Sequence, residues 1–408
     1  MIDGDHPESF GIYVHIPFCE SRCDYCAFHS STDRTVETQR TIVRRIIADI
    51  QTIEPPRVPT TVYVGGGTPT SLDPALLDEL LATLATRLLP IEFTLEANPE
   101  SATDERLSIA ARNGVDRLSV GVQSLDPDAL RRIGRRGTDV GRLAAIRSRW
   151  PATLSADLIT GVPGVHAGAS RADVERLAAI GVDHVSVYAL SIEPGTPLAA
   201  RGRLRDDARG RLRDDARARE AADDGWAELL RTLDSHGYRR YEVSSFTRAT
   251  PCLHNVGYWN QYDYIGVGPS AVSTITADGR GAHDGRVEPD APVEALRIEQ
   301  PADHARWLGL SGWRDAATER LSARDLVLEH LMLGLRQTGG LSFARFAARY
   351  GCDLRALVGN EIDLLRDESL VVADRVTLRA TPRGLDLLDR VLVRLFAAVS
   401  LNLDTVAT

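Results

Sequence analysis

Three cysteines stand close together near the start of the chain, in the stretch HIPFCESRCDYCAFHS of residues 15–30. The chain has five cysteines in 408 residues, and Cys19, Cys23 and Cys26 follow the spacing C-x3-C-x2-C. In a reducing compartment, clustered thiols are more often metal ligands or catalytic groups than disulfides. A structural zinc site takes four protein ligands, and only His15 or His29 is near enough in sequence to be the fourth.

An iron–sulfur cluster is the alternative that the spacing favours. Three thiolates leave one iron of a four-iron cluster open to an outside ligand, which is what a reactive cluster needs. The third interpretation of the same pattern is three incidental cysteines that bind no metal.

Composition excludes several classes of protein. The net charge is −9 and the isoelectric point is near 5.6, so general affinity for nucleic acid is not expected. No apolar run approaches the roughly 18 residues of a membrane-spanning helix, and the acidic stretch 1–11 does not resemble a secretory signal. We therefore expect a cytoplasmic protein without an integral membrane segment, and peripheral contact with a membrane stays open.

Alternating strand-like and helix-like stretches indicate an α/β fold. Helix-like stretches, such as 73–89 and 103–114, lie between strand-like runs, and this order predicts a parallel sheet with crossover helices, curled into a partial (β/α)6 TIM-like barrel. Functional residues of such barrels lie at the carboxyl ends of the strands. The predicted strands are 12–16, 61–66, 92–98, 117–124, 153–161 and 184–191.

Glycines and polar residues follow or interrupt these predicted strands. Glu96, Gln123 and Asp157 are polar groups on otherwise apolar strands, and such groups need partners if they are buried. Gly65, Gly66 and Gly67, followed by Thr68, remove side chains where a ligand would approach the backbone closely.

Six of these stretches resemble the radical S-adenosylmethionine proteins of the coproporphyrinogen-oxidase-like group. They occur in the family's order within the first 200 residues: YVHIPFCESRCDYC, VGGGTPTSL, LEANPE, RLSVGVQSLD, DLITGVPG and YALSIEPGTPL. The resemblance implies that Cys19, Cys23 and Cys26 hold one 4Fe-4S cluster, whose open iron takes S-adenosyl-L-methionine. It also implies a set of S-adenosylmethionine-binding residues, namely Tyr13, Tyr25, Gly66, Gly67, Thr68, Glu96, Gln123, Arg135 and Asp157. The alternative for Arg135 is a solvated arginine in the run Arg131–Arg136.

Two branches of this family differ near the cluster. The oxygen-independent coproporphyrinogen III oxidases have a longer segment before the cluster and a further cysteine soon after the third ligand, where this chain has Phe28. The other branch, the HemW-like haem chaperones, carries an H-N-x-x-Y-W motif. The segment CLHNVGYW of residues 252–259 matches it with His254, Asn255, Tyr258 and Trp259.

The match predicts a haem-binding site at these four residues. Haem iron takes an axial histidine or thiolate, so His254 is the expected ligand and Cys252 a second candidate. The aromatic rings of the motif would contact the porphyrin; the alternative is that they only pack in the core.

Three functions remain open at this point. The first is a haem chaperone that binds haem, a 4Fe-4S cluster and S-adenosylmethionine, and transfers haem to an acceptor protein, with respiratory haem proteins as suspected acceptors and a reductant for the cluster. The second is an oxygen-independent coproporphyrinogen III oxidase, which oxidises porphyrinogen propionates by radical chemistry. Gly137 and Val165 depart from the residues common in the family, His and Gln, and bear on such a reaction. The third is a structural iron–sulfur protein.

The resemblance divides the chain into three parts. Residues 1–200 form the radical S-adenosylmethionine core barrel, 201–300 a linker helix and the haem-motif segment that completes the barrel side, and 301–408 a HemN-type C-terminal domain. Alternation within 368–384 predicts a hairpin, and the domain is expected to be α+β and similar to a winged helix. The octapeptide GRLRDDAR occurs at 202–209 and again at 210–217, which is typical of a solvated helix or linker, with a docking surface as the alternative.

Overall fold

The computed structural model describes residues 10–54, 59–135, 140–166, 168–203, 216–276 and 295–406. Six strands lie side by side at its centre, and each pairs in parallel with the next. The predicted partial barrel and its six strands are confirmed. These strands are β1 (Gly11–Ile16), β2 (Thr61–Gly66), β3 (Glu92–Ala97), β4 (Arg117–Gln123), β5 (Thr153–Thr160) and β6 (His184–Ala189).

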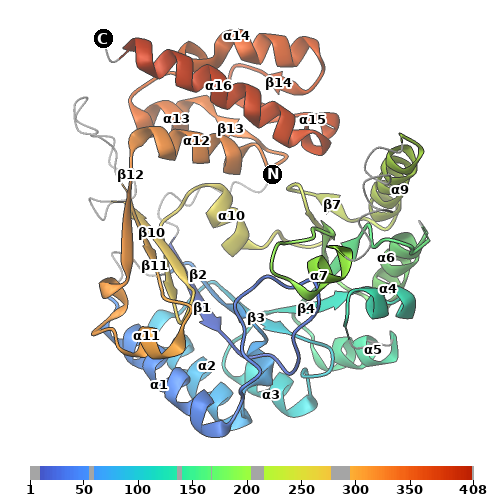
Figure 1. Ribbon diagram of the computed structural model, residues 1–408, viewed down its shortest axis with the longest axis vertical. Coiled ribbons are helices and arrows are strands. Elements are labelled where there is room, and N and C mark those ends of the chain that lie inside the picture. Colours follow the sequence, from blue (N-terminus) through green and yellow to red (C-terminus); the bar gives the residue numbers. More distant parts are fainter. Residues whose placement is uncertain are drawn as a thin grey trace.

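Crossover helices cover the outer face of this sheet (Figure 1). The outward residues of β1, such as Ile12 and Val14, are buried in the main core with the leucine stripe of the second helix, including Leu77 and Leu84. Since side chains alternate along a strand, the residues between them face the barrel interior. The helices are α1 (Val36–Thr52), α2 (Pro74–Leu88), α3 (Asp104–Arg112), α4 (Pro127–Arg132), α5 (Val140–Arg149) and α6 (Ala169–Ile180), with the 3-10 turn η1 (Pro69–Ser71).

Further strands extend the sheet at both edges to the order β12-β11-β10-β9-β1-β2-β3-β4-β5-β6-β8-β7. These are β7 (Arg239–Arg240), β8 (Ser245–Thr247), β9 (Tyr264–Val267), β10 (Val272–Thr276), β11 (Ala295–Glu299) and β12 (Ala317–Leu321). Because β12 belongs to this sheet, the barrel domain continues to Leu321, whereas the sequence analysis began the C-terminal domain at residue 301. The short helix α11 (His304–Leu308) and the turn η2 (Trp313–Asp315) belong to it as well, since Trp307 and Trp313 lie in the main core.

The helix α7 (Pro197–Arg203) contains the first two residues of the GRLRDDAR copies, and α9 (Ala216–Ser235) contains the last two. Residues 204–215, which make up most of those copies, lie outside the described residues.

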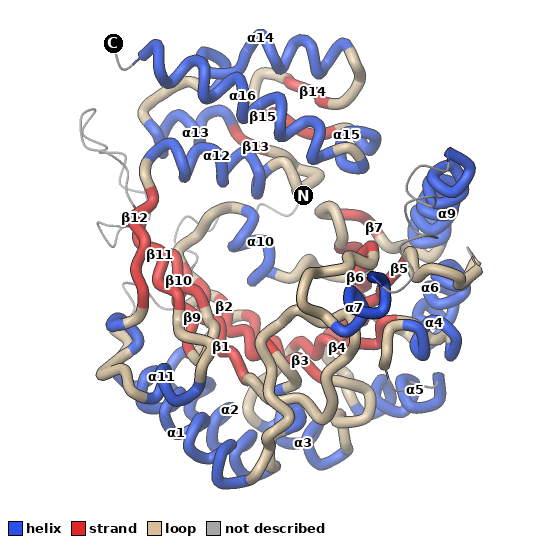
Figure 2. The backbone as a smooth tube through the Cα atoms, viewed as in Figure 1, coloured by secondary structure: helices blue, strands red, loops and turns tan. Residues whose placement is uncertain are grey.

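The C-terminal part forms a separate layer of helices with a small sheet, seen in red and orange above the barrel in Figure 1 and by element type in Figure 2. It has its own apolar core, which includes Leu331, Phe346 and Leu395. Its strands β13 (Leu341–Ser342), β14 (Val371–Ala373) and β15 (Thr377–Ala380) pair in the order β13-β15-β14, which contains the predicted hairpin. Its helices are α12 (Ala323–Gly334), α13 (Phe343–Tyr350), α14 (Leu354–Asp367), α15 (Pro382–Asp386) and α16 (Leu388–Val406).

One short helix, α10 (Leu253–Trp259), lies between the barrel and the C-terminal helices (Figure 1). It carries the H-N-x-x-Y-W motif. Among the described residues, no helix combines the length and the apolar character needed to span a bilayer.

Candidate functional site

The barrel interior holds a cavity of about 550 Å³ that reaches from the carboxyl ends of the strands down to α10. The three clustered cysteines line it, together with eight of the nine residues predicted for S-adenosylmethionine: Tyr25, Gly66, Gly67, Thr68, Glu96, Gln123, Arg135 and Asp157. The ninth, Tyr13, is not among the lining residues; its hydroxyl lies 3.1 Å from Nδ1 of His15. The strand ends thus bring together groups that are far apart in sequence.

Residues 17–31, here called the cluster loop, are closed at their base by hydrogen bonds. The Cys19 amide donates to the Ser31 carbonyl at 3.0 Å, and the Ser31 amide donates to the Pro17 carbonyl at 2.6 Å. In mid-loop, the Asp24 amide donates to the Ile133 carbonyl at 3.2 Å, and the Leu198 amide donates to the Asp24 carbonyl at 2.8 Å. The loop is therefore fixed by partners from two other segments.

The thiols of this loop have polar neighbours that suit a metal cluster. Sγ of Cys19 lies 3.7 Å from Oγ1 of Thr68, and Arg135 donates to Sγ of Cys23 at 3.5 Å. Burial raises the pKa of the Cys19 thiol and that of the Cys26 thiol, so both need a cation to displace their protons.

The donor set fits a cluster better than a single zinc ion. Within the described ranges, no three His, Cys, Asp or Glu side chains converge as ligands of one ion. A four-iron cluster does not need convergence, because each thiolate binds a different iron. His15, one of the two candidate fourth ligands, has Nδ1 at the Tyr13 hydroxyl and Nε2 3.1 Å from the His29 carbonyl oxygen. Cys19, Cys23 and Cys26 are thus the residues that would hold a cluster.

Close protein atoms explain the three glycines at the end of β2, Gly65, Gly66 and Gly67. A Cβ at Gly65 would lie 2.9 Å from the Glu96 carboxyl carbon, and a Cβ at Gly67 would lie 2.6 Å from the Phe18 carbonyl oxygen. Gly66 has φ of +111°, a conformation that side chains disfavour. The sequence interpretation gave this room to a ligand; the structure gives it to Glu96 and the cluster loop.

Glu96 is held at the cavity wall by two donors. Oε1 accepts from the Tyr63 hydroxyl at 2.7 Å, and Oε2 accepts from the Gly66 amide at 3.1 Å. Burial raises the pKa of Glu96 to about 7, in spite of these hydrogen bonds. A cationic ligand would favour its charged form, so Glu96 is suited to bind an amino group.

Arg135 points into the cavity and is not a solvated residue of an arginine run. Its Nη2 donates to Oδ1 of Asn98 at 2.8 Å and to the Gly121 carbonyl, while Nη1 reaches Cys23. The arginine therefore ties the cluster loop to the ends of β3 and β4. This position leaves both terminal nitrogens engaged with protein groups, whereas the resemblance placed Arg135 among the S-adenosylmethionine-binding residues.

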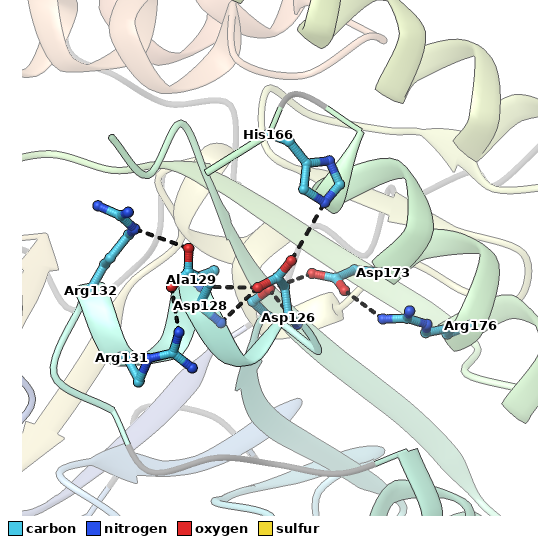
Figure 3. A network of polar contacts seen from close by, with 9 residues as sticks. Asp126, Asp128, Ala129, Arg131, Arg132, His166, Asp173 and Arg176 are labelled. Atoms are coloured by element: carbon cyan, nitrogen blue, oxygen red, sulfur yellow. Dashed lines mark hydrogen bonds and ion pairs between the residues drawn. The ribbon is translucent and has the colours of Figure 1, made fainter. Parts of the chain in front are cut away.

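Helix α4 follows β4 in the chain, and Ile133 at its end accepts the hydrogen bond from the cluster loop. The start of α4 is fixed by a polar network (Figure 3). Asp126 accepts from the Asp128 amide at 2.7 Å and from the Ala129 amide at 3.1 Å, which caps the helix. His166 lies 3.5 Å from the same carboxylate. Asp173 is tied to the same turn, because it accepts from the Ser124 hydroxyl at 2.6 Å.

The network anchors a strained backbone position. Gln123, which ends β4, has φ of +65° and follows an irregularity in the pairing with β5. A positive φ persists in a non-glycine residue only where the surroundings hold it, and here it turns the Gln123 side chain into the cavity.

The opposite end of the barrel is closed by α10. Oε2 of Glu92, the first residue of β3, accepts from the Leu253 amide at 2.9 Å, and Oε1 accepts from the His254 amide at 2.9 Å. The first turn of α10 is thus bound to a buried carboxylate. Burial raises the pKa of Glu92, and the positive charge of Arg117 and the free amides of the helix start act against this by favouring the charged form.

The four motif residues of α10 point in different directions. His254 is 3% exposed, and its Nδ1 lies 2.8 Å from the Thr61 hydroxyl while Nε2 lies 2.9 Å from the Tyr258 hydroxyl. Asn255 lines the cavity. Trp259 contacts the C-terminal domain, where the Arg336 guanidinium lies 4.5 Å from its ring centre.

The four residues predicted to bind haem therefore do not form a single open surface in this conformation. Both nitrogens of His254 are engaged, so one of these hydrogen bonds must break before the ring can bind iron. Cys252 is buried and its Sγ lies 3.5 Å from Oε1 of Glu92. Burial raises the pKa of the Cys252 thiol to about 12, which disfavours a thiolate ligand there.

Sequence reasoning missed the polar lining nearest α10. Arg117, Ser119, Ser155, His184 and Ser186 all line the cavity. A signal for them exists, because they recur at every second position of strands that are otherwise apolar.

Comparison with known proteins finds relatives that match this chain along most of its length and of their own. A family model described as the Radical SAM superfamily matches residues 13–169, and one described as the HemN C-terminal domain matches residues 321–387. The chain is 33% identical over 399 residues to the mitochondrial Radical S-adenosyl methionine domain-containing protein 1 of Bos taurus, covering 95% of this chain and 87% of the relative. It is 31% identical over 382 residues to heme chaperone HemW of Lactococcus lactis, covering 92% and 94%. The chain belongs to the HemW-like branch of the radical S-adenosylmethionine family.

A solved structure supports the fold of this HemW-like chain. Coproporphyrinogen III oxidase, HemN, from Escherichia coli superimposes with a TM-score of 0.75 at 20% identity, covering 96% of this chain and 91% of that one. At this identity the match concerns the architecture alone. Membership of the radical S-adenosylmethionine family implies a 4Fe-4S cluster and S-adenosylmethionine, and the cluster, when bound, supplies an electron and an open iron site.

Proposed function

We propose that this protein is a haem chaperone, which binds haem beside a 4Fe-4S cluster with S-adenosylmethionine and passes the haem to an acceptor protein. The observation that carries the proposal is the similarity to heme chaperone HemW of Lactococcus lactis along 92% of this chain. A cytoplasmic location, a reductant for the cluster and respiratory haem proteins as acceptors remain parts of the same proposal.

Cys19, Cys23 and Cys26 would hold the cluster in this function, and the cavity-lining residues would hold S-adenosylmethionine. Glu96 would accept from the amino group of that cofactor, and Asp157 from its ribose hydroxyls. These roles follow the chemistry of the side chains and their common cavity.

Haem binding through His254 would require one nitrogen of its ring to lose its present hydrogen-bond partner. One of the two hydrogen bonds of the ring, to Thr61 or to Tyr258, would break, at a net cost of about 0.5–1.5 kcal/mol, and the other ring nitrogen could keep its partner. An iron–histidine bond can offset a cost of this size. The closed helix would then act as the empty state of a carrier that must also release its cargo.

The test is an anaerobic haem titration of the protein with its cluster reconstituted. Binding should give a Soret band, and His254→Ala should shift its maximum and weaken binding while iron and sulfide content stay unchanged. Trp259→Ala should weaken binding and leave the maximum in place, because it removes contact and not a ligand. An unaltered spectrum in His254→Ala would place the ligand elsewhere.

The oxidase alternative is tested in the same preparation. Coproporphyrinogen is added with S-adenosylmethionine and a reductant, and loss of carbon dioxide is measured. Haem binding without turnover supports the chaperone. Turnover without haem binding would replace it with the oxidase, and a cluster with neither property would leave a structural iron–sulfur protein.

A further inference from the structure

The interior of this barrel is polar where parallel barrels usually are not. The inward residues of β4 are Arg117, Ser119 and Gly121, and all three line the cavity. Barrel interiors are normally filled by branched apolar side chains. The side of the cavity toward α10, here called the cavity floor, is formed by Arg117, Ser155, His184, Cys252 and Asn255.

Arg117 is the cation of this floor. It begins β4 and is 4% exposed, with its side chain toward the cavity. A guanidinium carries five N–H donors, and no hydrogen bond or ion pair joins that of Arg117 to another of the described residues; its nitrogens are open to the cavity and are not among the fully buried unpaired atoms. A cationic group that faces an enclosed cavity without a protein acceptor is suited to bind an anionic group of a ligand in that cavity.

The next strand has a second group without a partner at the same level. Thr94 of β3 lies directly beside Arg117 in the strand register. Its hydroxyl is fully buried and has no hydrogen-bond partner. Two neighbouring donors thus lack an acceptor.

The carboxylates near Arg117 make their hydrogen bonds with other protein donors and none with Arg117. Glu92 balances the charge of Arg117 at longer range, but its two oxygens accept from the α10 amides. Asp157 accepts from the Ser119 hydroxyl at 3.4 Å. His184 lies 2.9 Å from Oγ of Ser155 and 2.9 Å from the Tyr241 hydroxyl, so the rest of the floor satisfies itself.

We propose that Arg117 is the carboxylate-binding residue of the cavity floor, and that it receives a carboxylate carried by a ligand of this cavity. A guanidinium and a carboxylate pair through two parallel hydrogen bonds, which fixes the orientation of the bound molecule. The proposal rests on the proposed function for the first source of that carboxylate, a propionate of a tetrapyrrole. The second source is the amino-acid carboxylate of S-adenosylmethionine.

A metal-free porphyrin separates this proposal from haem ligation. Coproporphyrin III, which has four propionates and no iron, is titrated into the cluster-containing protein and followed by its fluorescence, in parallel with its tetramethyl ester. The unmodified protein should prefer the acid over the ester. Arg117→Gln should weaken binding of the acid by about tenfold or more and leave the ester unchanged, since only the charged hydrogen bonds are lost.

Two matched variants control this result. Arg131→Gln removes the same charge from an exposed position on α4 and should bind the acid like the unmodified protein. Arg117→Lys keeps the charge without the paired geometry and should show an intermediate preference. If Arg117→Gln does not retain its cluster, the lysine variant decides: a reduced preference supports the proposal and an unchanged one overturns it.

The second source has its own measurement. S-adenosylmethionine binding is followed by the paramagnetic resonance signal of the reduced cluster, with decarboxylated S-adenosylmethionine as the control. A loss confined to S-adenosylmethionine in Arg117→Gln would assign the carboxylate to the cofactor. Unchanged binding of both probes would overturn the proposal. Binding of coproporphyrin but not of haem by the unmodified protein would refute the chaperone and leave Arg117 in its role.

Discussion

The two ends of the barrel treat their polar groups in opposite ways. At the carboxyl ends of the strands, Cys19, Cys23 and Asp157 face a cavity and are available to a ligand. At the amino ends, both ring nitrogens of His254 and both carboxylate oxygens of Glu92 already have hydrogen-bond partners in the protein. The carboxyl end of the barrel thus offers side chains to a cofactor, and the amino end is closed by α10.

The difference shows that residue type and accessibility are separate properties of a site. A histidine in the H-N-x-x-Y-W motif has the chemistry of a haem ligand, yet in this conformation its ring belongs to a hydrogen-bonded chain from Thr61 to Tyr258. Haem binding at α10 would be a property of a second conformation. The predictions below test each end, beginning with the largest effect.

Loss of one of the three cluster thiols should abolish binding of the iron–sulfur cluster at the carboxyl ends of the strands. Replacing Cys19, Cys23 or Cys26 with Ala leaves two thiolates, and we expect nearly complete loss of bound iron and sulfide after anaerobic reconstitution. Cys352→Ala, in the C-terminal domain, is the control and should retain both. A cluster that survives in Cys23→Ala and disappears in Cys352→Ala would refute the ligand assignment.

Removal of Glu92 should open the closed end. Glu92→Ala leaves two helix amides without an acceptor and takes a countercharge from Arg117, which should cost about 3–5 kcal/mol of unfolding free energy. Glu92→Gln retains an acceptor and should cost less. Denaturant unfolding measures the loss, and hydrogen exchange of the α10 amides locates it.

The exposed Glu79 on α2 offers the matched control, since Glu79→Ala should change stability by less than about 0.5 kcal/mol. Equal losses in Glu79→Ala and Glu92→Ala would show that the carboxylate does not hold α10.

Acid should act on the closed end through His254. Burial lowers the pKa of His254 to about 3 from an ordinary 6.5, so the unfolded chain binds a proton that the native state refuses. Stability should therefore fall as the pH falls from about 6.5 toward 3, by about 1.4 kcal/mol per pH unit from this residue.

The comparison of unmodified protein with His254→Gln isolates that contribution. Burial also lowers the pKa of His15 to about 4 and that of His330 to about 3, so a weaker slope should persist in the variant. Identical slopes in the two proteins would mean that His254 is accessible to protons in the native state.

The smallest effect is expected at the helix that supports the open end. Asp126→Ala removes the cap of α4 and should cost about 1 kcal/mol. Asp128→Ala removes only exposed ion pairs with Arg131 and Arg132 and should cost less. Thermal unfolding ranks the two variants, and the reverse order would assign the stabilisation to the surface pairs.

The fold was predictable because its signals are local. Alternation of apolar residues marks each central strand, and the strand order follows from short right-handed crossovers. Since the carboxyl ends of parallel strands meet at one end of a barrel, the residues that follow them could be grouped by their positions in the chain. The glycines at the end of β2 were recognised correctly as close approaches, although the approaching atoms belong to protein groups such as Glu96 and Phe18.

The closed end was not predictable, because its contacts join distant parts of the chain. Glu92 and His254 are separated by 162 positions. No periodicity shows which side of a seven-residue helix meets the barrel, so the directions of Asn255 and Trp259 could not be derived. Arg117 stood in a recognised strand, but its lack of a partner is a property of the assembled interior.

The hydrogen bonds of Asp24 also set an order of events during synthesis. Its amide pairs with Ile133 and its carbonyl with Leu198, which are added to the chain more than 100 residues later. A ribosome must therefore complete almost half of the protein before the cysteine loop can take its final shape. Before that point the three thiols belong to a peptide that lacks these two anchors, so the native geometry of the loop is a product of barrel assembly and not of the loop sequence alone.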